Sequence, residues 1–240
     1  MSGRTPASFT TTKWSMVIHA GDSEDPAGRE ALETLCQRYW RPVYGYIRHR
    51  SLDKSAAEDL TQSFFAQLLE KRSLKAADPE RGRFRSFLLA SVRNFLSDSR
   101  DKERAQKRGG DQHFIPLDFS ETENLKHEPA DGITPEAVFE RQWANSVLAE
   151  VFNRLRKEAI EGQALERFER LEGFLTGELE GTRQSQVAEE LGMNAETLRV
   201  AIHRLRKRFG RLLREQVAQT VADPEQVDDE IRFLLTTLNS

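Results

Sequence analysis

The spacing of apolar residues along this chain is helical almost throughout. Apolar positions recur every three or four residues, and no stretch shows the strict alternation expected of a half-buried strand. This spacing gathers the apolar side chains on one face of each helix, where they can pack against neighbouring helices. The pattern therefore predicts an all-α fold.

Three helices are predicted in the first part of the chain. The first covers about 32–47 and tolerates Pro42 only as a kink or as a break between two shorter helices. The second begins near Ser55, which we expect to be an N-cap, with Glu58 completing a capping box. The third begins near Phe84 and runs into a strongly basic stretch.

A polar segment separates these helices from a second helical region. It contains paired glycines and scattered acids and has no sustained apolar period, which is typical of a flexible linker. Thr134 followed by Pro135 resembles an N-cap with proline at the first helical position. We therefore predict two helical domains, over 1–108 and 135–216, an acidic linker over 109–134, and a helical C-terminal extension over 217–240.

Composition excludes several classes of protein. Hydrophobic residues make up 38% and charged residues 31% of the chain, and no apolar run approaches the roughly 20 residues of a membrane span. The start of the chain lacks the apolar core of a secretory signal, so we expect a cytoplasmic protein. Cys36 is the only cysteine, which excludes an intramolecular disulfide, and we expect it to be buried.

The formal net charge of −3 hides a division of the chain into charged blocks. Residues 81–110 hold nine Lys or Arg against three acids, and residues 196–215 hold seven against two. Between them, residues 111–140 hold eight acids and one lysine. Two basic blocks on either side of an acidic connector indicate two separate contacts with a polyanion.

The most specific local pattern covers residues 184–208 and predicts a helix-turn-helix. Ala188 allows the two helices to approach closely, and Gly192 permits a tight turn at positive φ. The alternative is an ordinary helical hairpin with a solvated basic face. The residues that would reach base edges or phosphates are Glu196, Thr197, Arg199, Val200, His203, Arg204 and Lys207.

Together these motifs make the chain resemble the extracytoplasmic-function group of the sigma-70 family of bacterial RNA polymerase sigma factors. The resemblance covers about 32–213, apart from the linker. It implies that the helix-turn-helix of the second domain binds the upstream promoter element. Ala201 departs from the family pattern, where a basic residue is common, and we expect this to alter which bases are read.

In the first domain, residues 57–65 resemble the helix through which these factors bind the clamp of the largest polymerase subunit. Ala56 and Ser63 stand where family members usually carry acids, so the surface is less negative than the family pattern. We hypothesise that phosphorylation of Thr61 or Ser63 restores the missing charge; alternatively these hydroxyls are merely exposed or capping. The resemblance assigns polymerase binding to Glu58, Asp59, Gln62 and Ser63.

Residues 84–98 resemble the part of the family domain that binds and opens the downstream promoter element. The phenylalanines Phe84, Phe87 and Phe95 could be core residues or platforms on which an unstacked base lies. The loop over 74–83 would hold the extruded base by the same resemblance. The polar residues expected to contact this DNA are Arg81, Arg83, Arg85, Arg93, Asn94, Arg100, Lys102 and Arg104.

Two other classes of function compete with a sigma factor. An enzyme would need a convergent catalytic or metal site, and the best candidate, His49 with Asp53 and Glu58, matches no known motif. A helix-turn-helix repressor or activator would share the second domain but would leave the first unexplained. We therefore expect a non-enzymatic sigma factor without a cofactor.

The expected partners of such a factor are core RNA polymerase and promoter DNA. An anti-sigma factor and a Ser/Thr kinase are further candidates. The acidic helix near the end of the chain could dock on either domain or on a partner, and it could mask a basic DNA-binding face.

Overall fold

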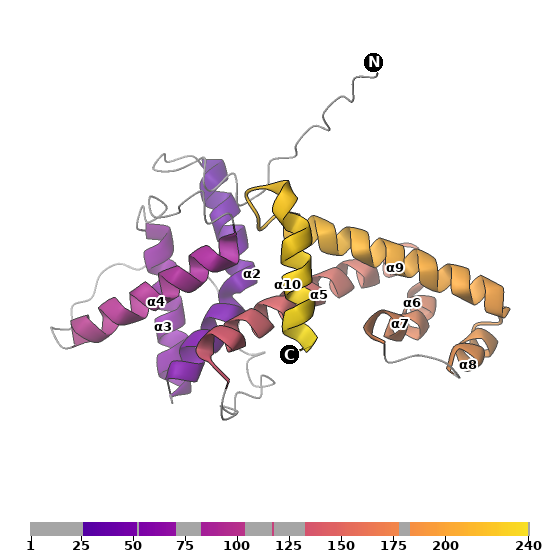
Figure 1. Ribbon diagram of the computed structural model, residues 1–240, viewed down its shortest axis with the longest axis horizontal. Helices are drawn as coiled ribbons and strands as arrows, with labels where there is room; N and C mark the ends of the chain where they lie inside the picture. The colour runs from indigo at the N-terminus through magenta and orange to yellow at the C-terminus, as the bar shows by residue number, and fades with distance from the viewer. Residues whose placement is uncertain are drawn as a thin grey trace, which may run out of the picture. The chain divides into compact units, whose positions relative to one another are not determined.

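The computed structural model describes residues 26–51, 53–70, 83–103, 117, 133–177 and 183–239. Over these residues every element is helical, and the single β-bridge joins Arg83 to Val221 outside any strand (Figure 1). The all-α prediction is confirmed. None of the helices in this part of the chain combines the length and the apolar character that a membrane crossing requires.

The first three helices are α2 (Pro26–Arg50), α3 (Lys54–Glu70) and α4 (Phe84–Glu103). Helix α2 runs through Pro42 without a break. The predicted capping box at Ser55 is wrong, because α3 begins one residue earlier. The cap is Asp53, whose Oδ2 accepts a hydrogen bond from the backbone N–H of Ala56 at 2.6 Å.

The remaining helices follow after residue 133. They are α5 (Pro135–Glu161), α6 (Leu165–Leu171), α7 (Gly173–Thr176), α8 (Arg183–Glu190), α9 (Ala195–Ala218) and α10 (Val227–Asn239), with a short 3₁₀ helix at Pro224–Gln226. Thr134 caps α5 as predicted, since its Oγ1 accepts a hydrogen bond from the N–H of Ala137 at 3.1 Å.

The chain divides into two compact units, and their boundaries differ from the predicted domains. Unit 1 comprises residues 1–146 and 218–240, and unit 2 comprises residues 147–217. Both boundaries therefore fall inside or at the end of long helices, within α5 and near the end of α9, whereas the sequence placed one in the segment 109–134. Most of that segment lies outside the described residues.

The division follows from which apolar side chains share a core. Phe139 and Trp143, in the first half of α5, are buried in unit 1, as is Leu234 of α10. The hydroxyl of Tyr39 in α2 accepts a hydrogen bond from Nε1 of Trp143 at 2.9 Å, and its burial raises its pKa. The start of α5 and the residues after 217 are thus parts of unit 1.

The phenylalanines of α4 belong mainly to the core of unit 1. Phe84 and Phe87 are buried, and Phe84 packs edge-on against Tyr39 with ring centroids 4.8 Å apart. Phe95 is half-buried, and its ring centroid lies 5.6 Å from that of Phe64 in α3. Of the two interpretations of Phe84 and Phe87, the core is therefore the correct one.

Candidate nucleic-acid interface

Helices α8 and α9 of unit 2 are joined by a tight turn over residues 191–194. Gly192 has φ +61°, as the sequence predicted, and the N–H of Met193 donates to the carbonyl oxygen of Ala188 at 2.8 Å. Asn194 caps α9, because its Oδ1 accepts from the N–H of Thr197 at 2.8 Å. This cap was not predicted from the sequence, although asparagine before a helix is a recognisable signal.

The two helices share a small core with α6 and α7. Ala201, in α9, is buried in this core, and Leu191 and Leu205 pack against it. Ala201 therefore does not lie on the outer face of α9, and the expectation that its departure from the family pattern alters base reading stays a prediction. The buried residues of the cluster are Leu171, Phe174, Val187, Ala188, Leu198, Ala201 and Ile202.

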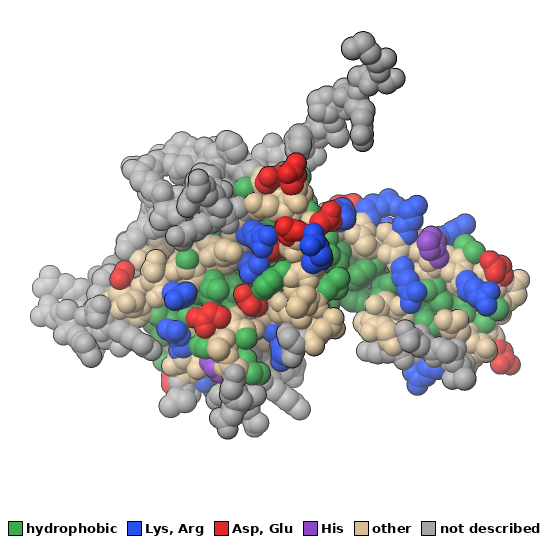
Figure 2. All heavy atoms as spheres, viewed as in Figure 1, with side chains coloured by type: hydrophobic (Ala, Val, Ile, Leu, Met, Phe, Trp, Pro, Cys, Tyr) green, Lys and Arg blue, Asp and Glu red, His purple; other side chains and the backbone are tan. Residues whose placement is uncertain are grey.

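The outer face of α9 is polar and mainly basic. Figure 2 shows Lys, Arg and His side chains gathered on the surface formed by this helix. Arg199 lies 3.6 Å from the carboxylate of Glu196 one turn away, an exposed pair that contributes little to stability. All seven residues predicted to face DNA in this unit are exposed: Glu196, Thr197, Arg199, Val200, His203, Arg204 and Lys207.

Other cations of the same basic block hold unit 2 together. Arg206 donates two hydrogen bonds to the carbonyl oxygen of Phe174, at 3.1 and 3.3 Å. Arg208 binds both carboxylate oxygens of Glu158 in α5, with Nε donating at 2.8 Å. This hydrogen bond holds the pKa of Glu158 below its ordinary value and raises that of Arg208. Arg206, although exposed like Arg204 and Lys207, therefore shares with Arg208 a structural contact within unit 2.

Helix α4 of unit 1 carries the second predicted DNA surface. Arg93 and Asn94 are exposed on this helix. Arg81 and Arg104 lie outside the described residues, and Arg100 and Lys102 lie in the helix but their side chains are not described. The structure thus places two of the eight predicted residues on the surface of α4 and leaves four unassigned.

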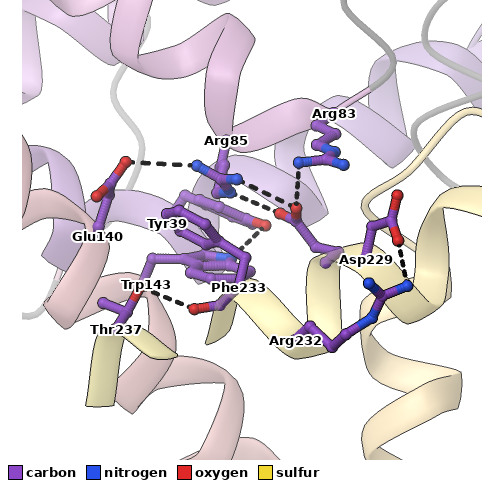
Figure 3. Close-up of polar contacts among 10 residues, drawn as sticks. Tyr39, Arg83, Arg85, Glu140, Trp143, Asp229, Arg232, Phe233 and Thr237 are labelled. Carbon is purple, nitrogen blue, oxygen red and sulfur yellow. Dashed lines mark hydrogen bonds and ion pairs between the residues drawn. The ribbon is translucent and has the colours of Figure 1, made fainter. Parts of the chain in front are cut away.

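The remaining two, Arg83 and Arg85, are held by acids of unit 1 (Figure 3). Nε of Arg85 lies 2.6 Å from Glu230 Oε1, and Nη1 of Arg83 lies 3.2 Å from Oε2 of the same carboxylate. Arg85 also lies 3.5 Å from Glu140, whose pKa is raised by burial in spite of this neighbouring cation. Arg85 is only 7% exposed, so the predicted contact between Arg85 and DNA is contradicted in this structure.

The predicted polymerase surface on α3 is partly exposed. Asp59 faces solvent, and Glu58 is half-buried with Lys54 3.9 Å away. Gln62 and Ser63 are half-buried on the same helix. The exposed charge of this face therefore comes mainly from Asp59.

Thr61 does not lie on this surface. Its side chain is buried, and its Oγ1 donates a hydrogen bond to the carbonyl oxygen of Ala57 at 2.7 Å. A kinase needs an accessible hydroxyl, so the hypothesis of phosphorylation at Thr61 is contradicted for the folded chain. For Ser63 it stays a prediction.

The alternative of a metal site finds no support in the part of the chain that the structure describes. No group of three or more His, Cys, Asp or Glu side chains is placed there to hold a metal ion, and this includes His49 with Asp53 and Glu58. Cys36 is fully buried as predicted, and burial raises the pKa of its thiol. Such a thiol is a packing residue.

Comparison with known families assigns one part of the chain. Residues 35–106 match the family model of Sigma-70 region 2, a range that includes most of α2 and all of α3 and α4. No curated protein and no solved structure matches the chain. The exposed residues of α3 and α4 described above therefore lie within the matched range, and α9 lies outside it.

Proposed function

We propose that this chain is a sigma factor of the sigma-70 family, in its extracytoplasmic-function group, that binds core RNA polymerase and directs promoter recognition. The observation that carries the proposal is the match of residues 35–106 to Sigma-70 region 2. A sigma factor performs no chemistry of its own and works in the cytoplasm, where the polymerase is. Its activity consists of holding the polymerase and a promoter at once.

In this proposal α3 binds the polymerase. Asp59 presents an exposed carboxylate, and Glu58 adds a second that is half-exposed. Carboxylates on a rigid helix complement the basic residues that the family helix meets on the polymerase clamp. Arg93 and Asn94 on α4 would then contact the downstream promoter element through its phosphates and an unpaired base.

Unit 2 would bind the upstream promoter element through α9. A helix whose outer face is exposed while its inner face is fixed on two or three neighbours can enter a major groove without disturbing the fold. Arg204 supplies a planar fork that suits guanine or phosphate, and Lys207 supplies a point charge one turn further on.

A second candidate function is a helix-turn-helix repressor or activator that is no subunit of the polymerase. The turn at Gly192 and the exposed basic face of α9 favour it equally well. It gives no role to the region that matches Sigma-70 region 2, so we place it second.

Transcription in vitro tests the proposal. Core polymerase with the purified chain should initiate at promoters that core alone ignores, and the chain should co-purify with core. Asp59→Arg should weaken polymerase binding about tenfold or more, because repulsion replaces attraction at the contact. Glu166→Arg is the matched control, since it reverses an exposed charge on α6 of unit 2 and should leave polymerase binding unchanged.

Two results would contradict the proposal. One is a chain that neither binds core polymerase nor changes where RNA synthesis starts. The other is equal polymerase binding by the Asp59→Arg and Glu166→Arg variants, which would remove α3 from the contact.

A further inference from the structure

The residues after unit 2 return to the start of α4. We call residues 218–239 the return segment. The N–H of Phe84 donates to the carbonyl oxygen of Thr220 at 2.9 Å, and Arg83 and Val221 form the β-bridge. Val221 and Leu234 are fully buried, so the segment is held by apolar packing as well as by its backbone.

The carboxylate of Glu230, in the return segment, forms ion pairs with two guanidinium groups. Arg85 contacts both of its oxygens, at 2.6 and 3.2 Å, and Arg83 lies 3.2 Å from the second. Glu230 is 1% exposed. A buried carboxylate is costly unless cations satisfy it, so these two arginines stabilise the charged form of Glu230 in its buried position.

Arg85 is the anchor of this arrangement. Its guanidinium lies 3.8 Å from the ring centroid of Phe233 in the return segment and 5.2 Å from that of Trp143 in α5. Glu140, at 3.5 Å, adds a second acid. These contacts, drawn in Figure 3, fix Arg85 among rings and carboxylates, so it acts as a positioning residue for Glu230.

Arg83, unlike Arg85, is partly accessible to solvent. Its side chain keeps 28% of its surface exposed, and it immediately precedes α4, the helix that carries Arg93. A carboxylate and a phosphate offer similar paired oxygens to a guanidinium. Glu230 therefore occupies Arg83 in the way that a DNA phosphate would.

Further acids of the return segment lie near this contact in the sequence. Asp223 and Glu225 are exposed just before α10, and Asp228 and Asp229 are exposed in its first turn. Negative charge at this place opposes the approach of a polyanion.

We infer that the return segment is a built-in competitor of DNA at the start of α4, with Glu230 neutralising Arg83 and Arg85 holding Glu230 in place. The inference rests on the proposed function, in which α4 contacts DNA. The return segment lies outside the range that matches Sigma-70 region 2, and in this inference it regulates DNA binding by the matched region.

The experiment compares Glu230→Gln with Asp229→Asn in the full chain. Glutamine keeps an acceptor for Arg85 but removes the charge that neutralises Arg83. Asp229→Asn removes the same charge from the adjacent residue, which is exposed and pairs with Arg232 of its own helix at 2.6 Å. Binding to a labelled DNA duplex of random sequence is measured over a range of NaCl concentrations.

The expected result follows from one additional cation, Arg83, becoming available to the duplex. Glu230→Gln should bind the duplex about threefold more tightly than Asp229→Asn, and the plot of log affinity against log salt should steepen by about 0.9. Equal affinities and equal slopes for the two variants would overturn the inference.

Substitution of Arg83 provides the second arm. In the wild-type chain Arg83→Gln should leave duplex affinity nearly unchanged, whereas in the Glu230→Gln background it should remove the gain. Arg93→Gln, at an exposed position of the same helix, should weaken binding in both backgrounds. An Arg83→Gln effect in the wild-type chain as large as that of Arg93→Gln would overturn the inference.

Two measurements keep this test separate from other failures. Thermal melting shows whether Glu230→Gln is folded; if it is not, the comparison of Arg83→Gln with Arg93→Gln in the wild-type chain decides. Polymerase binding is measured independently. If the wild-type chain does not bind polymerase, the proposed function is contradicted, but the comparison of duplex affinities among the variants can still be interpreted.

Discussion

At the scale of single residues, identical side chains in α9 have different roles. Arg204 faces solvent, whereas Arg206 and Arg208 bind Phe174 and Glu158. The helical period predicted the exposed face of α9, because it depends only on residues near in the sequence. The partners of Arg206 and Arg208 come from other helices, so a count of charges could not separate structural cations from exposed ones.

This division predicts opposite effects of two substitutions. Arg204→Ala should weaken binding to upstream promoter DNA by about 1 to 3 kcal/mol and leave the melting temperature unchanged. Arg206→Ala should lower the stability of unit 2 by about 1 kcal/mol, because the carbonyl oxygen of Phe174 loses its charged donor. Binding assays and thermal melting of both variants check this. Equal loss of stability in the two variants would contradict the assignment.

The pair of Glu158 and Arg208 predicts a pH dependence. The pKa of Glu158 is lowered in the folded state, so its stabilising contribution is present above the pKa of the unfolded chain and is lost as the pH falls through the folded pKa. Glu158→Gln should therefore cost up to about 1 kcal/mol at neutral pH and progressively less below about pH 4.5.

Denaturant melts at several pH values measure this difference. Glu161→Gln, an exposed position of the same helix, is the control and should show no such trend. A gap between wild type and Glu158→Gln that stayed constant down to low pH would rule out the contribution of the pair.

At the scale of elements, the sequence predicted helices well and their first residues less well. Gly192 was recognised because few other residues adopt φ +61°, and Thr134 because proline follows it. Ser55 was predicted as the cap because Glu58 follows it at the spacing of a capping box, whereas the structure uses Asp53. Both residue types can cap a helix, and the local sequence alone does not specify which of the two does so here.

Two glycines of unit 2 predict stability changes of opposite sign. Gly210 lies inside α9 with open space where a Cβ would stand, so Gly210→Ala should stabilise the unit by about 0.5 to 1 kcal/mol. Gly192 also has open space around it, but its φ of +61° strains any side chain, so Gly192→Ala should cost about 1 to 2 kcal/mol. Chemical denaturation of both variants tests this, and a shift in the same direction would refute it.

At the scale of the whole molecule, unit 1 takes in residues from both ends of the chain, which no local pattern indicated. The amphipathic period of α10 showed that one face is buried but not what covers it. Glu230 finds its partners Arg83 and Arg85 about 145 residues earlier in the chain. No local pattern carries such a pairing, and the charge blocks concealed it because Arg83 and Arg85 counted as cations available to DNA.

The packing of α10 in unit 1 predicts a contrast between two neighbouring leucines. Leu234 is fully buried and Leu235 is about half exposed. Leu234→Ala should destabilise unit 1 by about 2 to 5 kcal/mol through the cavity that it leaves, and Leu235→Ala by no more than about 0.5 kcal/mol. Hydrogen exchange can follow α2 and α4 in each variant; equal protection in both would show that α10 is dispensable to unit 1.

Because residues 218–239 belong to unit 1, that unit cannot be complete until they have been synthesised on the ribosome. Helices α2, α3 and α4 precede the rest of unit 1 in the chain and are therefore translated first. Trp143, which donates to Tyr39, and Thr220, which accepts from Phe84, are translated only later. Unit 2 is translated in full before Thr220. A nascent chain therefore contains all of unit 2 while the first helices of unit 1 still lack the contacts of the return segment.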